Sequence, residues 1–342
     1  MSRQLQRITR TFGTEPFSVE TALHAGFGRG ALRNRALARP HRGVRVRDEI
    51  DASLVSRALA LLPKLRPGDR FSHATALALL GCPIRVRPAT PVDVSSAPGT
   101  TPMRRAGVAG HRSEHASAVA LQVAARCWTN DGALSLPVSL PAAAVGEAAA
   151  LLPGPELVVA IDSLLHRGAT HYNSAVAMLT ERLLEDLRGA PSSRGAVRLR
   201  LAVGLARHGA ESRMETLLRL IGERVGISDL TLQGTIRSGD TEIGRFDLTD
   251  ERTRSYFEYD GGQHRTSRSQ YLRDIARYDG ARDAGWRGVR FHSEDVLLTP
   301  DRTAERMLDR LGRAPRRIPA PVAKFLAEGA ASPLVPASPH AR

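Results

Sequence analysis

Two short segments with alternating polar and apolar residues constrain the fold of this chain more than any other feature. They span residues 244–249 and 255–260, and a polar connection at 250–254 separates them. A period of two is typical of half-buried β-strands, and the short connection predicts that the two strands form a hairpin. In an antiparallel hairpin, Asp247 of the first strand can lie beside Glu258 of the second.

Acidic residues concentrate around this predicted hairpin in a chain that is otherwise basic. The segment from Asp240 to Asp260 holds seven acidic residues and three arginines, whereas the whole chain has a formal net charge of +14. Carboxylates gathered on one surface raise one another's pKa unless a cation or a proton lies among them. A divalent cation is the expected occupant.

An amphipathic helix is predicted upstream of the hairpin. Its apolar stripe follows helical spacing and should pack on the hairpin; it consists of Met214, Leu217, Leu218, Ile221 and Val225. Glu215 borders this stripe, so its side chain can reach the acidic cluster. Glu211 lies one turn earlier.

The chain resembles a known family in four segments that occur in a fixed order. They are Glu-Ser-Arg-Met-Glu-Thr at 211–216, Arg-Phe-Asp-Leu at 245–248, Phe-Glu-Tyr-Asp-Gly-Gly-Gln-His at 257–264 and Ala-Gly-Trp-Arg-Gly-Val-Arg-Phe at 284–291. They resemble bacterial domains related to very-short-patch-repair endonucleases, which belong to the PD-(D/E)XK, or restriction-endonuclease-like, superfamily. The resemblance covers about residues 206–312, the size of one domain. It implies a mixed sheet flanked by helices, and an enzyme that hydrolyses phosphodiester bonds.

The resemblance also implies a metal site. Asp247 and Glu258 would hold Mg²⁺ (or Mn²⁺), and the backbone carbonyl of Tyr259 and waters would complete its oxygen shell. Such an ion polarises the scissile phosphate and lowers the pKa of a bound water. By the same resemblance, Glu215 would orient that water.

Two residues after the hairpin are further catalytic candidates. His264 is placed to take or give a proton, since the unperturbed pKa of histidine, roughly 6.5, lies near working pH. Gln263 would donate a hydrogen bond to phosphate or water. Taken singly, each of these polar residues also fits an ordinary solvated position.

The chain departs from the superfamily pattern at the lysine that usually follows the second acid by two positions. Asp260 occupies that place, and Phe246 replaces the usual proline before the first acid; the only lysines are Lys64 and Lys324. The role of the lysine must therefore fall to Gln263, His264 or an arginine, or catalysis is absent. Asp260 is either a further metal ligand or a residue that holds His264 in one tautomer.

The segment after the acidic cluster is basic. Between His264 and Arg290 there are seven arginines, which are Arg265, Arg268, Arg273, Arg277, Arg282, Arg287 and Arg290. On a helix capped by Gly285, with Leu272, Ile275 and Ala276 on its buried side, arginines such as Arg265, Arg268 and Arg273 could grip phosphates. A solvated helix face balanced by aspartates explains the same pattern equally well. A strand at 286–292 and a helix from Asp301, with Ala304, Met307, Leu308 and Leu311 inside, would close the domain.

The first fifty residues indicate a small helix-turn-helix unit. Ser18 is expected to cap a helix that ends at Gly26, and a second helix is expected at about 29–38, followed by a wing strand at 41–46. This segment resembles the winged-helix domain of abortive-infection antitoxins of the type IV toxin–antitoxin class. The resemblance implies that Arg29, Arg33 and Arg35 face a DNA groove. A solvated accessory bundle is the other interpretation.

The middle of the chain and its tail carry weaker signals. Helices are expected at 141–152, 156–165 and 175–187, a surface loop at 88–102, a loop-and-strand pattern at 107–112, and no catalytic constellation in this part. A motif at 17–23 recurs at 71–77. The tail from Pro315 is rich in proline and alanine, which predicts mostly disorder or a loosely attached arm.

Together these features predict an α/β (α+β) protein with four parts. They are a winged-helix domain at 1–50, a mostly helical, antitoxin-like middle domain at 51–205, a nuclease domain at 206–312 and a disordered tail at 313–342. Two distant cysteines and no apolar run of membrane length predict a cytoplasmic protein without a membrane partner.

The expected function is metal-dependent DNA cleavage in phage defence, mobile-element conflict or DNA repair, with DNA as partner. A cognate toxin or defence partner stays open. The alternatives are an antitoxin-like transcriptional regulator whose nuclease-fold domain does not cut, and an RNA-processing nuclease.

Overall fold

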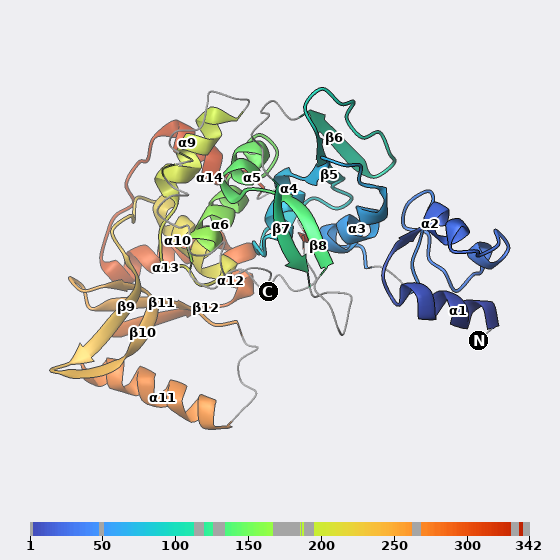
Figure 1. Cartoon of the computed structure of the whole chain (residues 1–342). Coiled ribbons are helices and arrows are strands. Elements are labelled where there is room, and N and C mark those ends of the chain that lie inside the picture. Colours follow the sequence, from blue (N-terminus) through green and yellow to red (C-terminus); the bar gives the residue numbers. More distant parts are fainter. Residues whose placement is uncertain are drawn as a thin grey trace.

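The computed structural model is a mixed α/β protein, as the sequence predicts. It describes residues 3–47, 51–112, 120–125, 134–166, 185, 187, 195–261, 268–329 and 335–337. Figure 1 shows the chain running from a small N-terminal unit, through a five-stranded sheet with helices, to a four-stranded sheet at the opposite end.

The N-terminal unit contains α1 (Arg3–Phe12), α2 (Val19–His24) and a two-stranded ribbon of β1 (Phe17–Ser18) and β2 (Val44–Arg45). The predicted cap is confirmed, because the Ser18 hydroxyl accepts a hydrogen bond from Thr21 N at 2.9 Å. Gly26 follows α2 with φ +80°, a backbone conformation that favours glycine.

The predicted second helix at 29–38 is wrong. Only one 3₁₀ turn, Ala31–Arg33, occurs there. Glycines at 28 and 30 make a helix start costly, and the chain leaves the helical region at Asn34 with ψ 136°. Arg29, Arg33 and Arg35 are exposed, but no helix presents them together.

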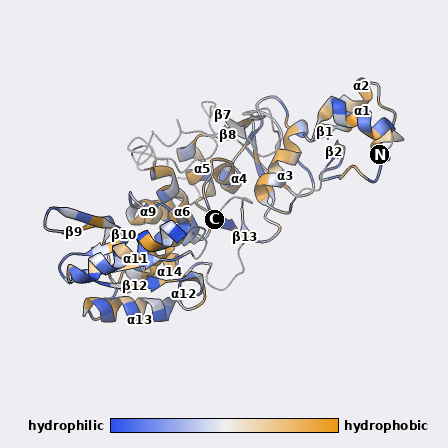
Figure 2. Ribbon diagram, turned by 90° about the horizontal axis from the view of Figure 1, so that it is seen from below, coloured by the Kyte–Doolittle hydropathy of each residue, from blue (hydrophilic) through white to orange (hydrophobic). Residues whose placement is uncertain are grey.

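The middle of the chain surrounds a sheet with strand order β6-β5-β3-β8-β7. Its strands are β3 (Arg70–Phe71), β5 (Val92–Ser96), β6 (Val108–Arg112), β7 (Ala120–Ala125) and β8 (Leu134–Ser139). The helices around it are α3 (Leu54–Leu61), α4 (His73–Leu79), α5 (Pro141–Ala148), α6 (Gly154–Leu165) and α9 (Ala196–Leu205), and a 3₁₀ turn, Leu62–Lys64, follows α3. Figure 2 shows α3 as mostly apolar, which agrees with its buried position.

The middle segment agrees with the sequence predictions in its helices and edge strand but not in the segment before that strand. The surface loop expected at 88–102 is wrong in its centre, because β5 is entirely buried between β6 and β3. Its Val-Asp-Val-Ser-Ser sequence is too short for its period to stand out from the prolines around it. The strand at 107–112 is confirmed by β6, and helices α5 and α6 lie where expected. The helix expected at 175–187 lies outside the described residues, apart from two positions.

The C-terminal sheet has the order β12-β11-β10-β9. Its strands are β9 (Thr231–Ser238), β10 (Thr241–Asp250), β11 (Ser255–Tyr259) and β12 (Arg287–Phe291). The predicted hairpin is confirmed as β10–β11, and β12 runs parallel to β11. In Figure 1 the sheet lies between α10 (Arg213–Arg224) and α13 (Pro300–Leu311) on one side and α11 (Arg268–Asp283) on the other.

Each face of this sheet has its own core. Leu218, Phe257, Phe291 and Met307 belong to the core under α10 and α13, as the periodicity of those helices predicts, and the short helix α12 (Ser293–Leu297) adds Val296. Phe246, Tyr256 and Ala281 form the core under α11. Gly288 of β12 allows this packing, because a Cβ there would lie 2.0 Å from Cζ of Tyr256.

The tail is folded over residues 313–329, so the prediction of a mostly disordered tail is wrong there. Helix α14 (Ala320–Leu326) buries Phe325 and Leu326 in the core of the middle segment. Beyond it, β13 (Val335–Pro336) pairs with β4 (Arg85–Val86). The tail is mostly alanine and proline, but it contains two adjacent large apolar side chains. Their burial holds α14 against the middle segment.

Buried ion pairs join the middle segment to the C-terminal sheet. Glu156 and Asp162 of α6 accept hydrogen bonds from Arg213 (2.5 Å) and Arg219 (2.7 Å) of α10. All four side chains are buried. Within the described residues, none of the helices is both long and apolar enough to cross a membrane.

Candidate active site

The hairpin brings the two predicted metal-binding acids to one pocket. Leu248 pairs with Phe257, and the same register continued by one residue places Asp247 opposite Glu258. Both side chains line an open pocket of about 540 Å³. The pocket is further lined by Tyr259, Asp260, Gly261, Tyr271, Asp274, Ile275, Arg277, Tyr278, Asp279 and Arg290.

Asp247 is held by the backbone of the neighbouring strand. Its Oδ2 atom accepts a hydrogen bond from Tyr259 N at 2.8 Å, and among the described residues its other oxygen accepts none. Burial, together with the negative charges of Glu215 and Glu258, raises the pKa of Asp247 to about 8, although the Tyr259 hydrogen bond and the charge of Arg277 oppose this shift. The surroundings of Asp247 therefore disfavour its negative charge, as expected where carboxylates gather.

Glu258 is buried, and both of its carboxylate oxygens accept hydrogen bonds from side chains of α11. Arg277 donates to both of its oxygens, at 2.9 and 3.2 Å, and the Tyr278 hydroxyl donates to Oε2 at 2.5 Å. Burial raises the pKa of Glu258 from its ordinary value, although Arg277 and Tyr278 oppose this shift. Arg277 is itself fixed by a hydrogen bond of 2.6 Å to the Arg245 carbonyl.

Glu215 approaches the acidic pair from the first turn of α10. Ser212 caps this helix, and Oε2 of Glu215 accepts hydrogen bonds from Glu211 N at 2.8 Å and Gln233 Nε2 at 3.0 Å. Burial raises the pKa of Glu215. Glu215 does not line the pocket, but its charge acts on Asp247. Glu215 therefore influences the acidic cluster through its charge rather than by lining the pocket.

The remaining predicted site residues separate into two groups. Asp260 lines the pocket, with Oδ2 3.8 Å from Nη1 of Arg290. Gln263, His264 and Arg265 lie outside the described residues, so their roles stay predictions. Arg268 and Arg273 are exposed on α11.

The predicted buried side of α11 is wrong. Leu272, Ile275 and Ala276 are exposed, whereas Arg277, Tyr278 and Ala281 face the sheet. An arginine was expected to point outward, yet the Arg277 guanidinium lies over the rings of Phe246 and Tyr278, at 4.8 and 4.9 Å. The buried acid Glu258 opposite this helix turns the arginine inward, because an unpaired buried charge is far costlier than an exposed apolar side chain.

Arg277 and Tyr278 are therefore the site residues that the sequence analysis missed. In the sequence, Arg277 is one of seven arginines after the acidic cluster, and its spacing does not distinguish it from the others. The available signal was the Arg277–Tyr278 pair itself, one cation and one hydroxyl donor adjacent on a helix that follows a buried acid.

Comparison with known proteins gives no relative: no protein-family model, curated protein or solved structure matches this chain.

Proposed function

We propose that this protein is a metal-dependent DNA endonuclease with a restriction-endonuclease-like C-terminal part. The observation that carries the proposal is the pair Asp247 and Glu258, which come from adjacent strands of a hairpin and line one pocket. Arg277 and Arg290 line the same pocket and supply positive charge for a phosphate backbone. Phage defence, mobile-element conflict or DNA repair is the proposed setting.

The donor set fits Mg²⁺ or Mn²⁺. These hard cations prefer oxygen ligands, and carboxylates of Asp247 and Glu258 face the pocket, where Asp260 adds a third. When bound, the ion would polarise a phosphate and acidify a water. Glu215, oriented by Glu211 and Gln233, holds a negative charge near Asp247 that favours a cation at this place.

Arg277 is the proposed replacement for the missing lysine. It is the cation nearest to the second acid among the described side chains that line the pocket, with its nitrogens 2.9 and 3.2 Å from the Glu258 oxygens. Metal binding at Glu258 requires that this pair loosen so that one oxygen turns to the ion. The released guanidinium would then be free to donate to a phosphate oxygen.

A non-cutting DNA-binding regulator is the second candidate, and one observation favours it. Both Glu258 oxygens already accept hydrogen bonds from Arg277 and Tyr278, as in an ion pair that only stabilises the fold. In that case the N-terminal unit, proposed as a winged-helix DNA reader, would carry the function. Its ribbon and exposed arginines support this role, although Arg29 and Arg35 lie outside its one 3₁₀ turn.

Cleavage and binding assays on the full chain separate these functions. Supercoiled plasmid, single-stranded DNA and RNA are incubated with Mg²⁺ or with EDTA, and binding of duplex DNA is measured in both. The nuclease predicts nicked plasmid only with Mg²⁺. Sequence-selective DNA binding that survives EDTA, without any cleavage, would support the regulator instead, and cleavage of RNA alone would indicate an RNA-processing enzyme.

A further inference from the structure

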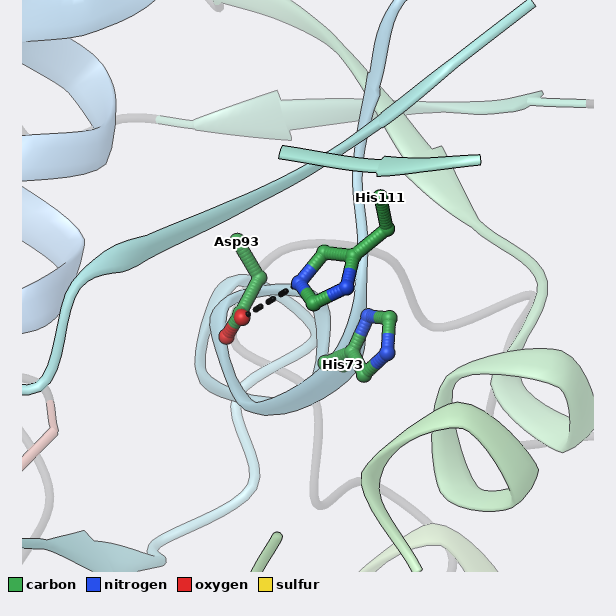
Figure 3. A group of neighbouring side chains, drawn as sticks. All are labelled: His73, Asp93 and His111. Carbon is green, nitrogen blue, oxygen red and sulfur yellow. Dashed lines mark hydrogen bonds and ion pairs between the residues drawn. The ribbon is translucent and has the colours of Figure 1, made fainter. Parts of the chain in front are cut away.

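A second cluster of chemically active side chains lies in the middle of the chain, where the sequence analysis expected none. It consists of His73, Asp93 and His111, shown in Figure 3, whose potential ligand atoms all lie within 4.8 Å of one another. Its side chains offer two imidazole nitrogens and one carboxylate oxygen, all from described residues.

Three separate elements contribute to this cluster. His73 is the first residue of α4, Asp93 lies in the buried strand β5, and His111 lies in β6 at the edge of the sheet. Strands β5 and β6 are adjacent and parallel, and their pairing fixes the position of Asp93 relative to His111. A ligand bound here would tie the edge strand and the start of α4 to the sheet.

Asp93 is the fixed centre of the cluster. It is only 3% exposed, its Oδ1 lies 2.9 Å from Nε2 of His111, and Thr75 Oγ1 lies 3.4 Å from Oδ2. Thr75 also accepts a hydrogen bond from Asp93 N at 2.8 Å. Hydrogen bonds of this kind orient the carboxylate ligands of metal sites.

The two imidazoles lie against each other beside Asp93. Their rings stack with centroids 3.8 Å apart and an interplanar angle of 24°. Nδ1 of His73 is 2.9 Å from the Ser72 hydroxyl.

The backbone at His73 is held in an unfavourable conformation. His73 has φ +51°, in the left-handed region that side chains other than glycine rarely adopt. Its N–H donates to Glu147 Oε2 at 3.3 Å, and Glu147 is paired with Arg70 at 3.1 Å. The related motif at 17–23 lacks this geometry, because Ser18 caps its helix whereas Ser72 makes no such cap and instead contacts His73.

We infer that His73, Asp93 and His111 form a binding site for one divalent transition-metal ion, with Zn²⁺ as the best match. Two imidazole nitrogens and one carboxylate oxygen are a donor set that zinc accepts, with a fourth position left for water or another ligand. Ligand atoms around tetrahedral zinc lie about 3.3 Å apart. The Asp93–His111 pair must therefore open by only a few tenths of an ångström, and no other pair must close by more than about 1.5 Å.

The inference is independent of the proposed nuclease function, because hard carboxylates of the C-terminal pocket select Mg²⁺ rather than zinc. The test is a titration of the full chain, without a polyhistidine tag, with ZnCl₂ after treatment with a chelator. An Asp247→Asn background removes the acidic pocket as a competing site. We expect one Zn²⁺ per chain in this background, measured by calorimetry.

Variants locate the ion. His73→Ala and His111→Gln should weaken zinc binding by at least ~100-fold, since even residues that merely support a ligand contribute about 10–100-fold. His208→Ala, at an exposed histidine outside the cluster, should bind as the parent does. Circular dichroism checks that each variant is folded.

Two results would overturn the inference. One is equal zinc binding by folded His73→Ala and His111→Gln chains, and the other is no bound zinc in the parent, which would leave a metal-free Asp93–His111 ion pair. If the variants do not fold, the parent loaded with Co²⁺ decides: intense visible absorption of tetrahedral cobalt, displaced by Zn²⁺, supports the site, and its absence rejects it.

Discussion

Asp247 is a partly buried acidic residue whose surroundings disfavour its own negative charge. Burial and the charges of Glu215 and Glu258 raise its pKa to about 8, well above the ordinary value of 3.8 for an aspartate. The fold therefore keeps a proton that the unfolded chain has lost, and stability falls as pH rises between these two values. Asp247→Asn removes this dependence. Its gain in free energy of unfolding over the wild type should grow with pH, by at most ~1.4 kcal/mol per pH unit.

Urea denaturation at about pH 5, about pH 6 and about pH 7.5, without divalent metal, measures this difference. Asp283→Asn is the matched control, because the Asp283 side chain is 75% exposed and should give no such pH-dependent gain. A constant difference between Asp247→Asn and wild type over this range would show that the carboxyl is not held in a proton-retaining environment.

The Arg277–Glu258 pair is a second prediction at the residue scale. Arg277→Ala leaves the buried Glu258 uncompensated, so we expect a loss of roughly 3 kcal/mol of stability. Glu258→Gln added to Arg277→Ala should recover part of this loss, with a coupling of roughly 2 kcal/mol in a double-mutant cycle. Additive effects in urea denaturation would mean that the two groups do not interact in solution.

At the scale of elements, local periodicity predicted those segments whose partners are close in sequence. The hairpin β10–β11 and the buried faces of α10 and α13 follow from alternation or helical spacing alone. Helix α11 could not be oriented in this way, because Glu258 and Phe246 on distant strands determine which face turns inward. The acids of the candidate site were predictable, whereas its cation was not.

The same reason explains two other errors. The His73–Asp93–His111 cluster joins three elements across 38 residues, and no spacing motif marks it. The prediction for the tail rests on its overall composition, which does not show that Phe325 and Leu326 are buried in a core. Long-range burial, rather than propensity, decides both cases.

Helix α14 gives a direct prediction on the tail. Phe325 is 2% exposed and packs against Gly154, where a Cβ would lie 2.3 Å from the Phe325 carbonyl oxygen. Phe325→Ala should reduce the free energy of unfolding by about 3–5 kcal/mol, as for other buried aromatics. Leu298→Ala, at a side chain that is 74% exposed, should change it by less than about 0.5 kcal/mol. Equal stability of the two variants in urea would show that α14 is not docked.

At the scale of the whole molecule, a net charge of +14 favours a polyanionic partner, and the exposed arginines at both ends are the proposed contacts. Arg29→Ala with Arg33→Ala should reduce the slope of log affinity for DNA against log salt by up to ~1.8, and so should Arg268→Ala with Arg273→Ala. Binding at several salt concentrations measures the slope. If either double variant keeps the parental slope, that end of the molecule does not touch phosphates.

In the proposed function, Asp247 and Glu258 hold an ion that supports cleavage of a nucleic acid backbone. The most direct measurement is the rate at which wild type and Asp247→Asn nick supercoiled plasmid in Mg²⁺. We predict nicking by wild type that stops in EDTA, and a rate at least ~100-fold lower for Asp247→Asn, with duplex binding retained. Equal rates for the two proteins, or a wild-type rate that EDTA leaves unchanged, would show that Asp247 does not hold an ion needed for cleavage.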